Sequence, residues 1–166
     1  MNSQNHTSWY RYLDLHQQEL VNVSFSLLEK QDIFSDIKDF SFMVFPMSKA
    51  YEGFLKKVFY DLQLISKETY QGRRFRIGRA FNPDVRSHQR DEDWLYDDVE
   101  LQFGREVARQ LWNTWLVCRN RVFHYFTNEK QALSFDEAKQ KINMIVESIQ
   151  LVAHQLDIDQ NQQKKE

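Results

Sequence analysis

The sequence predicts an all-α protein, an antiparallel bundle of four or more helices. Only 4 glycines and 2 prolines occur among its 166 residues, too few for the turns that an all-β sandwich or barrel needs about every 8–12 residues. Hydrophobic residues make up 42% of the chain and aromatic residues 14%, so apolar burial offsets the conformational entropy lost on folding. The length suits one domain, which we place at residues 1–156, followed by a polar tail at 157–166 that we expect to fray.

Apolar periodicity defines the first two predicted helices. From residue 9 to residue 27, side chains recur at alternating intervals of four and three residues, which predicts one helix with a single stripe: Trp9, Leu13, His16, Leu20, Val23 and Leu27. Residues 31–46 lose this period, and we expect residues 40–46, which end in Pro46, to form an apolar, extended connector. After a cap at Ser48, the period returns as far as Ile65 and predicts the second helix.

Two further helices are predicted in the second half of the chain. Six acidic residues lie between Asp91 and Glu100, and they suit the positive end of a helix that begins near Trp94 and runs to Cys118. Ser134 and Glu137 form a capping box. Apolar residues then repeat at intervals of three and four and predict the last helix: Ile142, Ile145, Ile149, Val152 and Leu156.

Charge is unevenly distributed although the formal net charge is only −2. Seven basic and two acidic residues lie between Lys67 and Arg90, which predicts a long basic loop between the second and third helices. Such a loop suits a phosphate-tracking surface, with Tyr70, Phe75 or Phe81 available to stack on unpaired bases. The alternatives are a surface that docks a partner protein, or a solvated loop whose arginines pair with the acidic residues at 91–100.

Targeting, metal and redox signals are weak in this chain. The first residues have neither the basic nor the apolar region of a signal peptide, and no apolar run approaches the roughly 18 residues of a membrane span. We therefore expect a cytoplasmic protein with no membrane partner. The single cysteine, Cys118, excludes an internal disulfide, and we expect it to be buried and inert. The histidines stand without a second ligand at helical spacing, so we expect no metal and no cofactor.

One short motif carries the strongest functional signal. Residues 118–125 contain Arg119-Asn120-x-x-x-His124. This pattern resembles the Arg-x(4–6)-His signature of the HEPN superfamily, small helical domains of which many are metal-independent ribonucleases acting as toxins or antiviral effectors. Residues 45–55 and 72–83 are also similar to RNase LS-type toxins of this superfamily. The resemblance spans about residues 40–155 and implies a free-standing HEPN domain.

The resemblance implies an endoribonuclease that uses the ribose 2′-OH as nucleophile and leaves a 2′,3′-cyclic phosphate. It implies that Arg119, His124 and Glu52 are catalytic, and that Glu52 either orients His124 or holds Arg119. A plain i,i+4 pair of Glu52 with Lys56 is the alternative. The expected substrate-binding residues are Asn120, Arg73, Arg74, Arg76 and Arg79.

The chemistry of RNA cleavage without a metal explains why histidine and arginine are expected at the site. Imidazole titrates near neutral pH and can therefore transfer protons. A guanidinium stays positively charged and stabilises the negative charge that develops at the phosphoryl group. In an ideal α-helix, however, Arg119 and His124 point about 140° apart, whereas Asn120 and His124 lie within about 40°. Either the helix ends or distorts here, or the two residues meet through a second copy of the chain. The alternative is that Arg119, Arg121 and His124 are ordinary helix-end polar residues.

The resemblance also implies partners. A homodimer is expected because the family pairs two motifs across a dimer axis, and an antitoxin or inhibitor protein is expected because unrestrained RNA cleavage is lethal. For the basic loop, docking of that antitoxin is the alternative to RNA contact. The competing functional class is a non-catalytic HEPN module that acts in dimerisation, RNA binding or partner binding.

Overall fold

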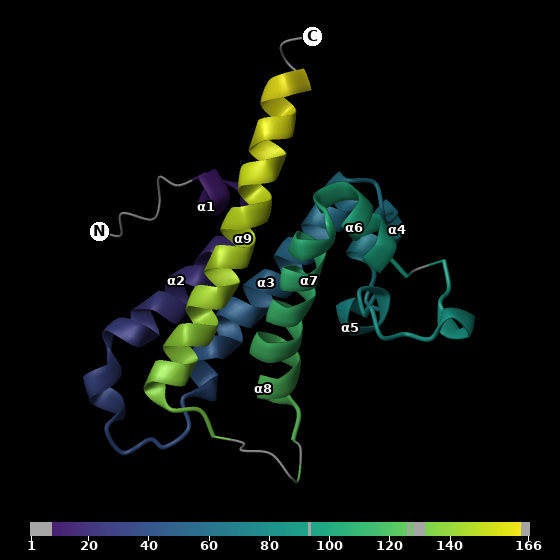
Figure 1. The fold of residues 1–166 in the computed structure, drawn as a ribbon. Helices are drawn as coiled ribbons and strands as arrows, with labels where there is room; N and C mark the ends of the chain where they lie inside the picture. The colour runs from purple at the N-terminus through teal and green to yellow at the C-terminus, as the bar shows by residue number, and fades with distance from the viewer. Residues whose placement is uncertain (1–7, 93, 126, 128–131, 164–166) are drawn as a thin grey trace.

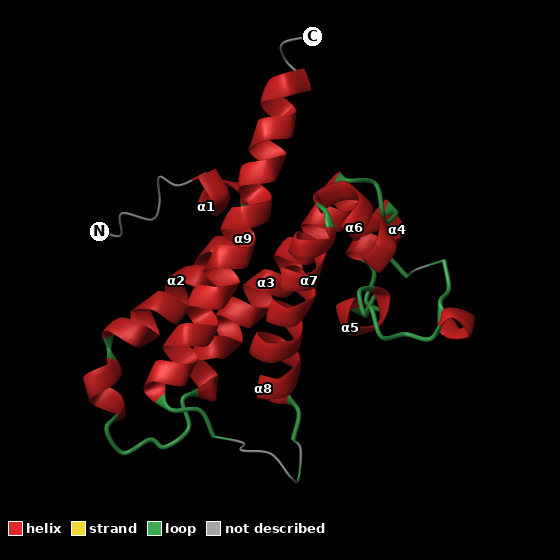
Figure 2. Ribbon diagram, viewed as in Figure 1, coloured by secondary structure: helices red, strands yellow, loops and turns green. Residues whose placement is uncertain are grey.

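The protein is an antiparallel helical bundle, as predicted. The computed structural model describes residues 8–92, 94–125, 127 and 132–163, and within them every regular element is helical (Figure 2). The four long helices are α2 (Leu15–Glu29), α3 (Ser41–Asp61), α7 (Arg105–Trp115) and α9 (Phe135–Gln163). α2 and α7 run in one direction, and α3 and α9 run in the other (Figure 1). No helix in the described part of the chain is both long enough and apolar enough to cross a membrane.

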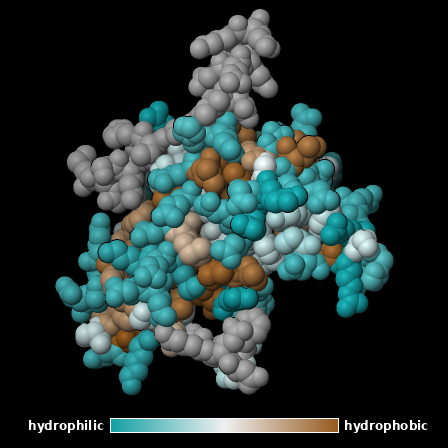
Figure 3. Space-filling model, in the orientation of Figure 1, coloured by the Kyte–Doolittle hydropathy of each residue, from teal (hydrophilic) through white to brown (hydrophobic). Residues whose placement is uncertain are grey.

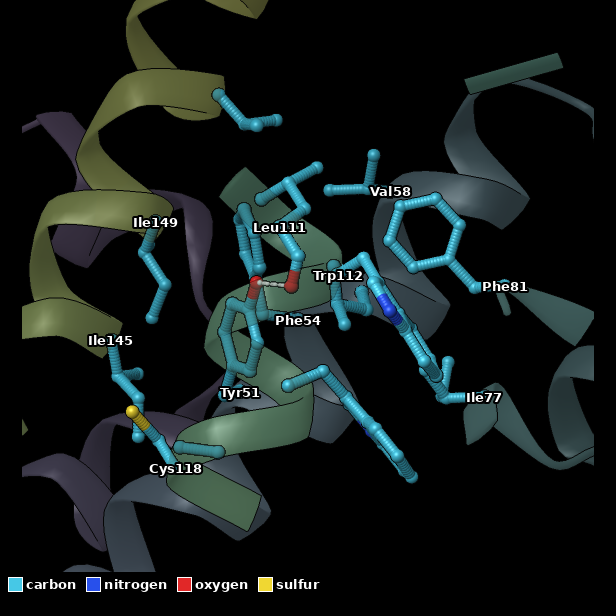
Figure 4. Close-up of a cluster of buried hydrophobic side chains, with 14 of the residues drawn as sticks. Tyr51, Phe54, Val58, Ile77, Phe81, Leu111, Trp112, Cys118, Ile145 and Ile149 are labelled. Atoms are coloured by element: carbon cyan, nitrogen blue, oxygen red, sulfur yellow. Dashed lines mark hydrogen bonds between the residues drawn. The ribbon is translucent and has the colours of Figure 1, made fainter. Parts of the chain in front are cut away.

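α3 lies at the centre of the bundle and packs against α2, α7 and α9. Its buried face meets side chains of α7 and α9 in one apolar core (Figure 4). Buried polar contacts fix the helices within this core: the Tyr51 hydroxyl donates to the Leu111 carbonyl at 2.9 Å, and the hydroxyls of Thr114 and Ser148 lie 2.8 Å apart. Burial raises the pKa of Tyr51, so the phenol remains a neutral donor.

The prediction of one helix over residues 9–27 is wrong. The chain forms α1 (Ser8–Tyr12), breaks, and begins α2 at Leu15. Asp14 causes the break because its carboxylate accepts the Gln17 amide at 2.8 Å, while the Gln17 side chain accepts the Asp14 amide at 3.3 Å. As a result His16 and Val23, which the predicted stripe includes, are exposed.

The extended connector predicted at residues 40–46 is also wrong. After the 3₁₀ turn η2 (Gln31–Phe34), α3 begins at Ser41 and continues through Pro46. Met43, Val44 and Met47 are fully buried at helical spacing, so packing outweighs the backbone hydrogen bond that proline cannot donate. Ser48 therefore caps no helix; its hydroxyl donates to the Phe45 carbonyl at 3.0 Å.

The third predicted helix is divided at Gly104. α6 (Tyr96–Phe103) carries Asp97 and Asp98 in its first turn, as the acidic cluster predicts. Gly104 then adopts a φ of 84°, which glycine accepts without strain and other residues rarely do, and α7 follows in a new direction. Beyond α7, the π-helical turn η4 (Leu116–Asn120) and the short helix α8 (Arg121–Phe123) continue the helix, and we call α7, η4 and α8 together the rod.

The last predicted helix is confirmed. The Ser134 amide donates to the Glu137 carboxylate at 2.7 Å and the Glu137 amide donates to the Ser134 hydroxyl at 3.3 Å, so the capping box is present. All five apolar residues of its stripe are buried. The backbone of residues 157–163, part of the tail predicted to fray, continues α9. Their side chains and residues 164–166 lie outside the described part.

The basic stretch from Lys67 to Arg90, which we call the basic segment, is not the long loop that the sequence predicts. It contains α4 (Lys67–Gln71), α5 (Ile77–Ala80) and the 3₁₀ turn η3 (Ser87–Gln89), which lie beside the bundle near α6 (Figure 1). Phe75, Ile77 and Phe81 are buried and attach the segment to the core; the Phe81 ring contacts Phe59, Tyr96 and Trp112. Tyr70 stacks on Tyr60. The two buried phenylalanines are therefore not available to stack on bases, contrary to the prediction.

Asp39 joins the beginnings of α3 and α9. Its Oδ1 accepts hydrogen bonds from the Ser41 amide at 3.0 Å, the Ser41 hydroxyl at 2.6 Å and the Leu133 amide at 3.1 Å. The Phe40 amide donates to the Leu133 carbonyl at 2.9 Å. Partial burial opposes ionisation of Asp39, but the hydrogen bonds from Ser41 and Leu133 outweigh it and hold the pKa of the carboxyl below its usual value.

We expect Asp39→Asn to lower the free energy of unfolding by about 1 kcal/mol at pH 7. A lowered pKa in the folded state stabilises the fold above the usual carboxyl pKa, and this contribution disappears as the pH falls through the lowered value. Denaturation curves at pH 7 and about pH 3 test this, with the exposed neighbour Asp36→Asn as control. An equal loss at both pH values would contradict the role assigned to the Asp39 charge.

Candidate active site

The predicted motif lies on a distorted helix. Between α7 and α8, residues 116–120 form a π-helical turn in which the Arg121 amide donates to the Leu116 carbonyl. The Lys141 ammonium of α9 donates to the Val117 carbonyl at 3.1 Å. The rotation of an ideal α-helix therefore does not apply between Arg119 and His124. The helix distorts and then ends here, which is the first of the two geometries left open by the sequence.

Arg119 is held from a second helix. Its Nε lies 3.3 Å from Oε2 of Glu52 on α3, and about a third of each side chain is exposed. The guanidinium also lies 5.7 Å from the ring centre of Trp115, one turn back on α7. Glu52 thus makes one of the two contacts expected of it, the contact with Arg119. Among the described residues no ion pair joins Glu52 to Lys56, whose ammonium instead lies over Phe75 at 5.9 Å.

His124 lies immediately after α8. Its backbone is extended, with φ −107° and ψ 137°, and its amide donates to the Asn120 carbonyl at 3.2 Å. The residue is exposed, while Asn120 is half-buried at the end of the π-helical turn. The structure therefore gathers Glu52, Arg119 and Asn120 around this turn and places the exposed His124 at the end of the same rod.

Four of the six arginines of the basic segment line a pocket of about 530 Å³, which we call the arginine pocket: Arg73, Arg74, Arg76 and Arg79. Side chains over this side of the molecule are mainly hydrophilic (Figure 3, right). A second pocket, of about 670 Å³, lies between Pro83 and α7. Neither pocket is lined by Glu52, Arg119 or His124, so the predicted catalytic and phosphate-tracking residues occupy separate places.

The acidic residues at 91–100 do pair with part of the basic segment. Arg79 forms an ion pair with Asp91, and Arg90 lies 3.8 Å from Asp97 and stacks on Trp94. This agrees with the solvated, ion-paired alternative for Arg79 and Arg90. Among the described residues, Arg73, Arg74 and Arg76 have no carboxylate partner.

Cys118 is buried, as expected, with its sulfur 4.0 Å from that of Met144. Desolvation raises the pKa of this thiol to about 12, so it is protonated at neutral pH and is no nucleophile. Across the described residues, no three His, Cys, Asp or Glu side chains lie close enough together to hold a metal ion.

Two residues that contact the site, Trp115 and Gly78, are not among those predicted from the sequence. Trp115 falls within the third predicted helix without a role of its own, although its position four residues before Arg119 already places both on one helix face. Gly78 packs against the Trp115 ring, so α5 approaches α7 more closely than any residue with a Cβ allows. Through this contact the basic segment touches the ring beneath Arg119.

Comparisons with family models, with curated proteins and with solved structures found no match to this chain. The resemblance to the HEPN superfamily stays a prediction from the motifs.

Proposed function

We propose that this protein is a metal-independent endoribonuclease of a toxin–antitoxin or antiphage type that acts in the cytoplasm. The observation that supports this best is the Glu52–Arg119 ion pair on a π-helical turn. Such turns are frequent at functional sites. Here the turn presents a permanently charged guanidinium a few residues before an exposed imidazole, the two groups that phosphodiester cleavage without a metal requires.

In the proposed reaction, neutral His124 accepts the proton of a ribose 2′-OH. The 2′-oxygen forms a bond to phosphorus, the bond to the 5′-oxygen breaks, and the imidazolium returns the proton to that oxygen. The products are a 2′,3′-cyclic phosphate and a 5′-hydroxyl. Arg119 stabilises the charge that develops on the phosphoryl oxygens, and Glu52 fixes the direction of its guanidinium. Asn120 contributes an amide donor to the substrate.

The proposed active form is a homodimer in which the motifs of two chains face each other. His124 and its neighbour Tyr125, which is 80% exposed, leave this end of the rod accessible to a second chain. An antitoxin or inhibitor protein would silence the enzyme by covering the same end.

A second candidate function is a non-catalytic helical module that binds a partner. Phe45 favours it: this side chain is 54% exposed, and its ring makes a T-shaped contact with that of Phe123, the residue before His124. A large exposed aromatic side chain at the end of a bundle is typical of protein contacts.

Incubation of the purified protein with single-stranded RNA in excess EDTA separates these functions. We expect cleavage to persist in EDTA and the fragments to carry 2′,3′-cyclic phosphate ends. Cleavage that EDTA abolishes would contradict the metal-independent mechanism. No cleavage under any condition, by a protein with the helical signal of the folded chain, would favour the non-catalytic module.

A further inference from the structure

The arginine pocket lies between α4 and α5, away from the proposed catalytic residues. We infer that this pocket binds the phosphate ester of a nucleotide and so forms a second RNA-binding site of the enzyme; the choice of RNA as the source of the nucleotide rests on the proposed function.

The charge of the pocket supports an anionic ligand. Four guanidinium groups and one carboxylate, that of Glu68, line it. Arg79 is neutralised by Asp91, but Arg73, Arg74 and Arg76 have no carboxylate partner among the described residues. Like charges gathered around one cavity repel each other. A bound phosphate removes this repulsion and matches the planar, forked geometry of guanidinium donors.

The arginines project from a fixed backbone. The Nη1 of Arg76 donates to the Arg73 carbonyl at 2.5 Å and to the Phe75 carbonyl at 3.3 Å. Between and beyond the arginines, Phe75 and Ile77 are buried in the core. Binding of a ligand here therefore costs little conformational entropy of the protein backbone, because the fold already holds the segment in place.

Size and lining distinguish a nucleotide from a small inorganic ion. About 530 Å³ is the volume of a typical small-molecule site and exceeds what one phosphate fills. Phe75 and Ala80 add a small apolar surface to the lining, against which the apolar face of a sugar can lie. The pocket is therefore suited to a nucleotide whose phosphate meets the arginines.

The test measures binding without cleavage, using the full chain with His124→Ala and a fluorescent single-stranded RNA. We expect Arg73→Gln with Arg74→Gln to weaken binding at least about tenfold at low salt. The slope of log affinity against log salt should become shallower by about 0.7 for each phosphate that the variant no longer neutralises. The matched control is Arg105→Gln with Arg109→Gln, which removes the same charge from exposed positions on α7 and should change little. Arg73→Lys with Arg74→Lys keeps the charge and should recover binding in part.

Competition by adenosine monophosphate identifies the source of the nucleotide. If adenosine monophosphate displaces the RNA only at millimolar concentration, the site binds a nucleotide within an RNA strand. If it displaces the RNA at micromolar concentration, the site binds a free nucleotide. In either case binding should depend on the arginines. Equally weakened binding in the α7 control, or unchanged affinity and salt slope in the pocket variants, would overturn the inference. Binding that depends on the arginines in a protein that never cleaves RNA would instead contradict the proposed function alone.

Discussion

Replacing His124 with alanine is expected to reduce RNA cleavage by about 10²–10⁴-fold, the usual effect of losing a group that transfers a proton in the transition state. The imidazole is exposed at the end of the rod, so its removal leaves no cavity in the core. The helical signal and the melting temperature should therefore stay close to those of the unaltered protein. Initial rates of cleavage of a labelled RNA, with circular dichroism on the same samples, measure both quantities.

Two matched controls show whether the effect is specific. His16 is also an exposed histidine, paired with Glu19 on α2, and His16→Ala should cleave normally. Arg119→Ala should lose activity comparably to His124→Ala, whereas Arg121→Ala, two residues further along the same rod, should not. Activity of the His124→Ala protein within a few-fold of the original would refute the role assigned to this residue.

Gly78→Ala is expected to destabilise the fold by about 1–3 kcal/mol, because it inserts a methyl group where none fits. A Cβ at this position would lie 3.0 Å from Cζ3 of Trp115 and even closer to Cη2. The indole Nε1 of Trp115 is buried without a hydrogen-bond partner among the described residues. The ring is therefore fixed by packing alone and should move, taking with it its stack on Trp112 and the contact with Arg119.

Denaturation monitored by tryptophan fluorescence measures this destabilisation, and the cleavage rate of the folded variant reports the displacement of Arg119. The matched experiment is a double-mutant cycle with Trp115→Phe, which removes the part of the ring that meets the new methyl group. The cost of Gly78→Ala should be smaller in that background. Strictly additive effects would mean that the methyl group clashes elsewhere.

The fold class and the last helix could be predicted because their signals are local and repeated. The capping box at Ser134 and the apolar stripe after it act within a few residues, and packing agrees with them. Errors arose where a short signal competed with a long apolar pattern. Asp14 divided a continuous stripe, and Pro46 lay inside a helix because the buried residues around it gain more by packing than one hydrogen bond is worth.

The candidate site was less accessible to sequence reasoning. The contact of Glu52 with Arg119 joins residues 67 positions apart, and no periodicity indicates it; only the family resemblance selected both residues. No periodicity or capping pattern in the sequence indicates the π-helical turn. The Lys141 ammonium of α9 contacts the Val117 carbonyl of this turn, and the sequence of the helix itself does not indicate such a contact from another helix.

α1, the first helix of the chain, packs against α9, the last helix, and this arrangement bears on the order of folding. α2 and α3 are neighbours in the chain, so their association closes only a short loop and can occur early. The association of α1 with α9 closes a loop that contains nearly the whole domain, and the entropy of that closure is recovered only after the rest of the bundle has assembled. We therefore expect Trp9 and Leu13 to be among the last apolar side chains that become buried, and α1 to be among the last helices to dock.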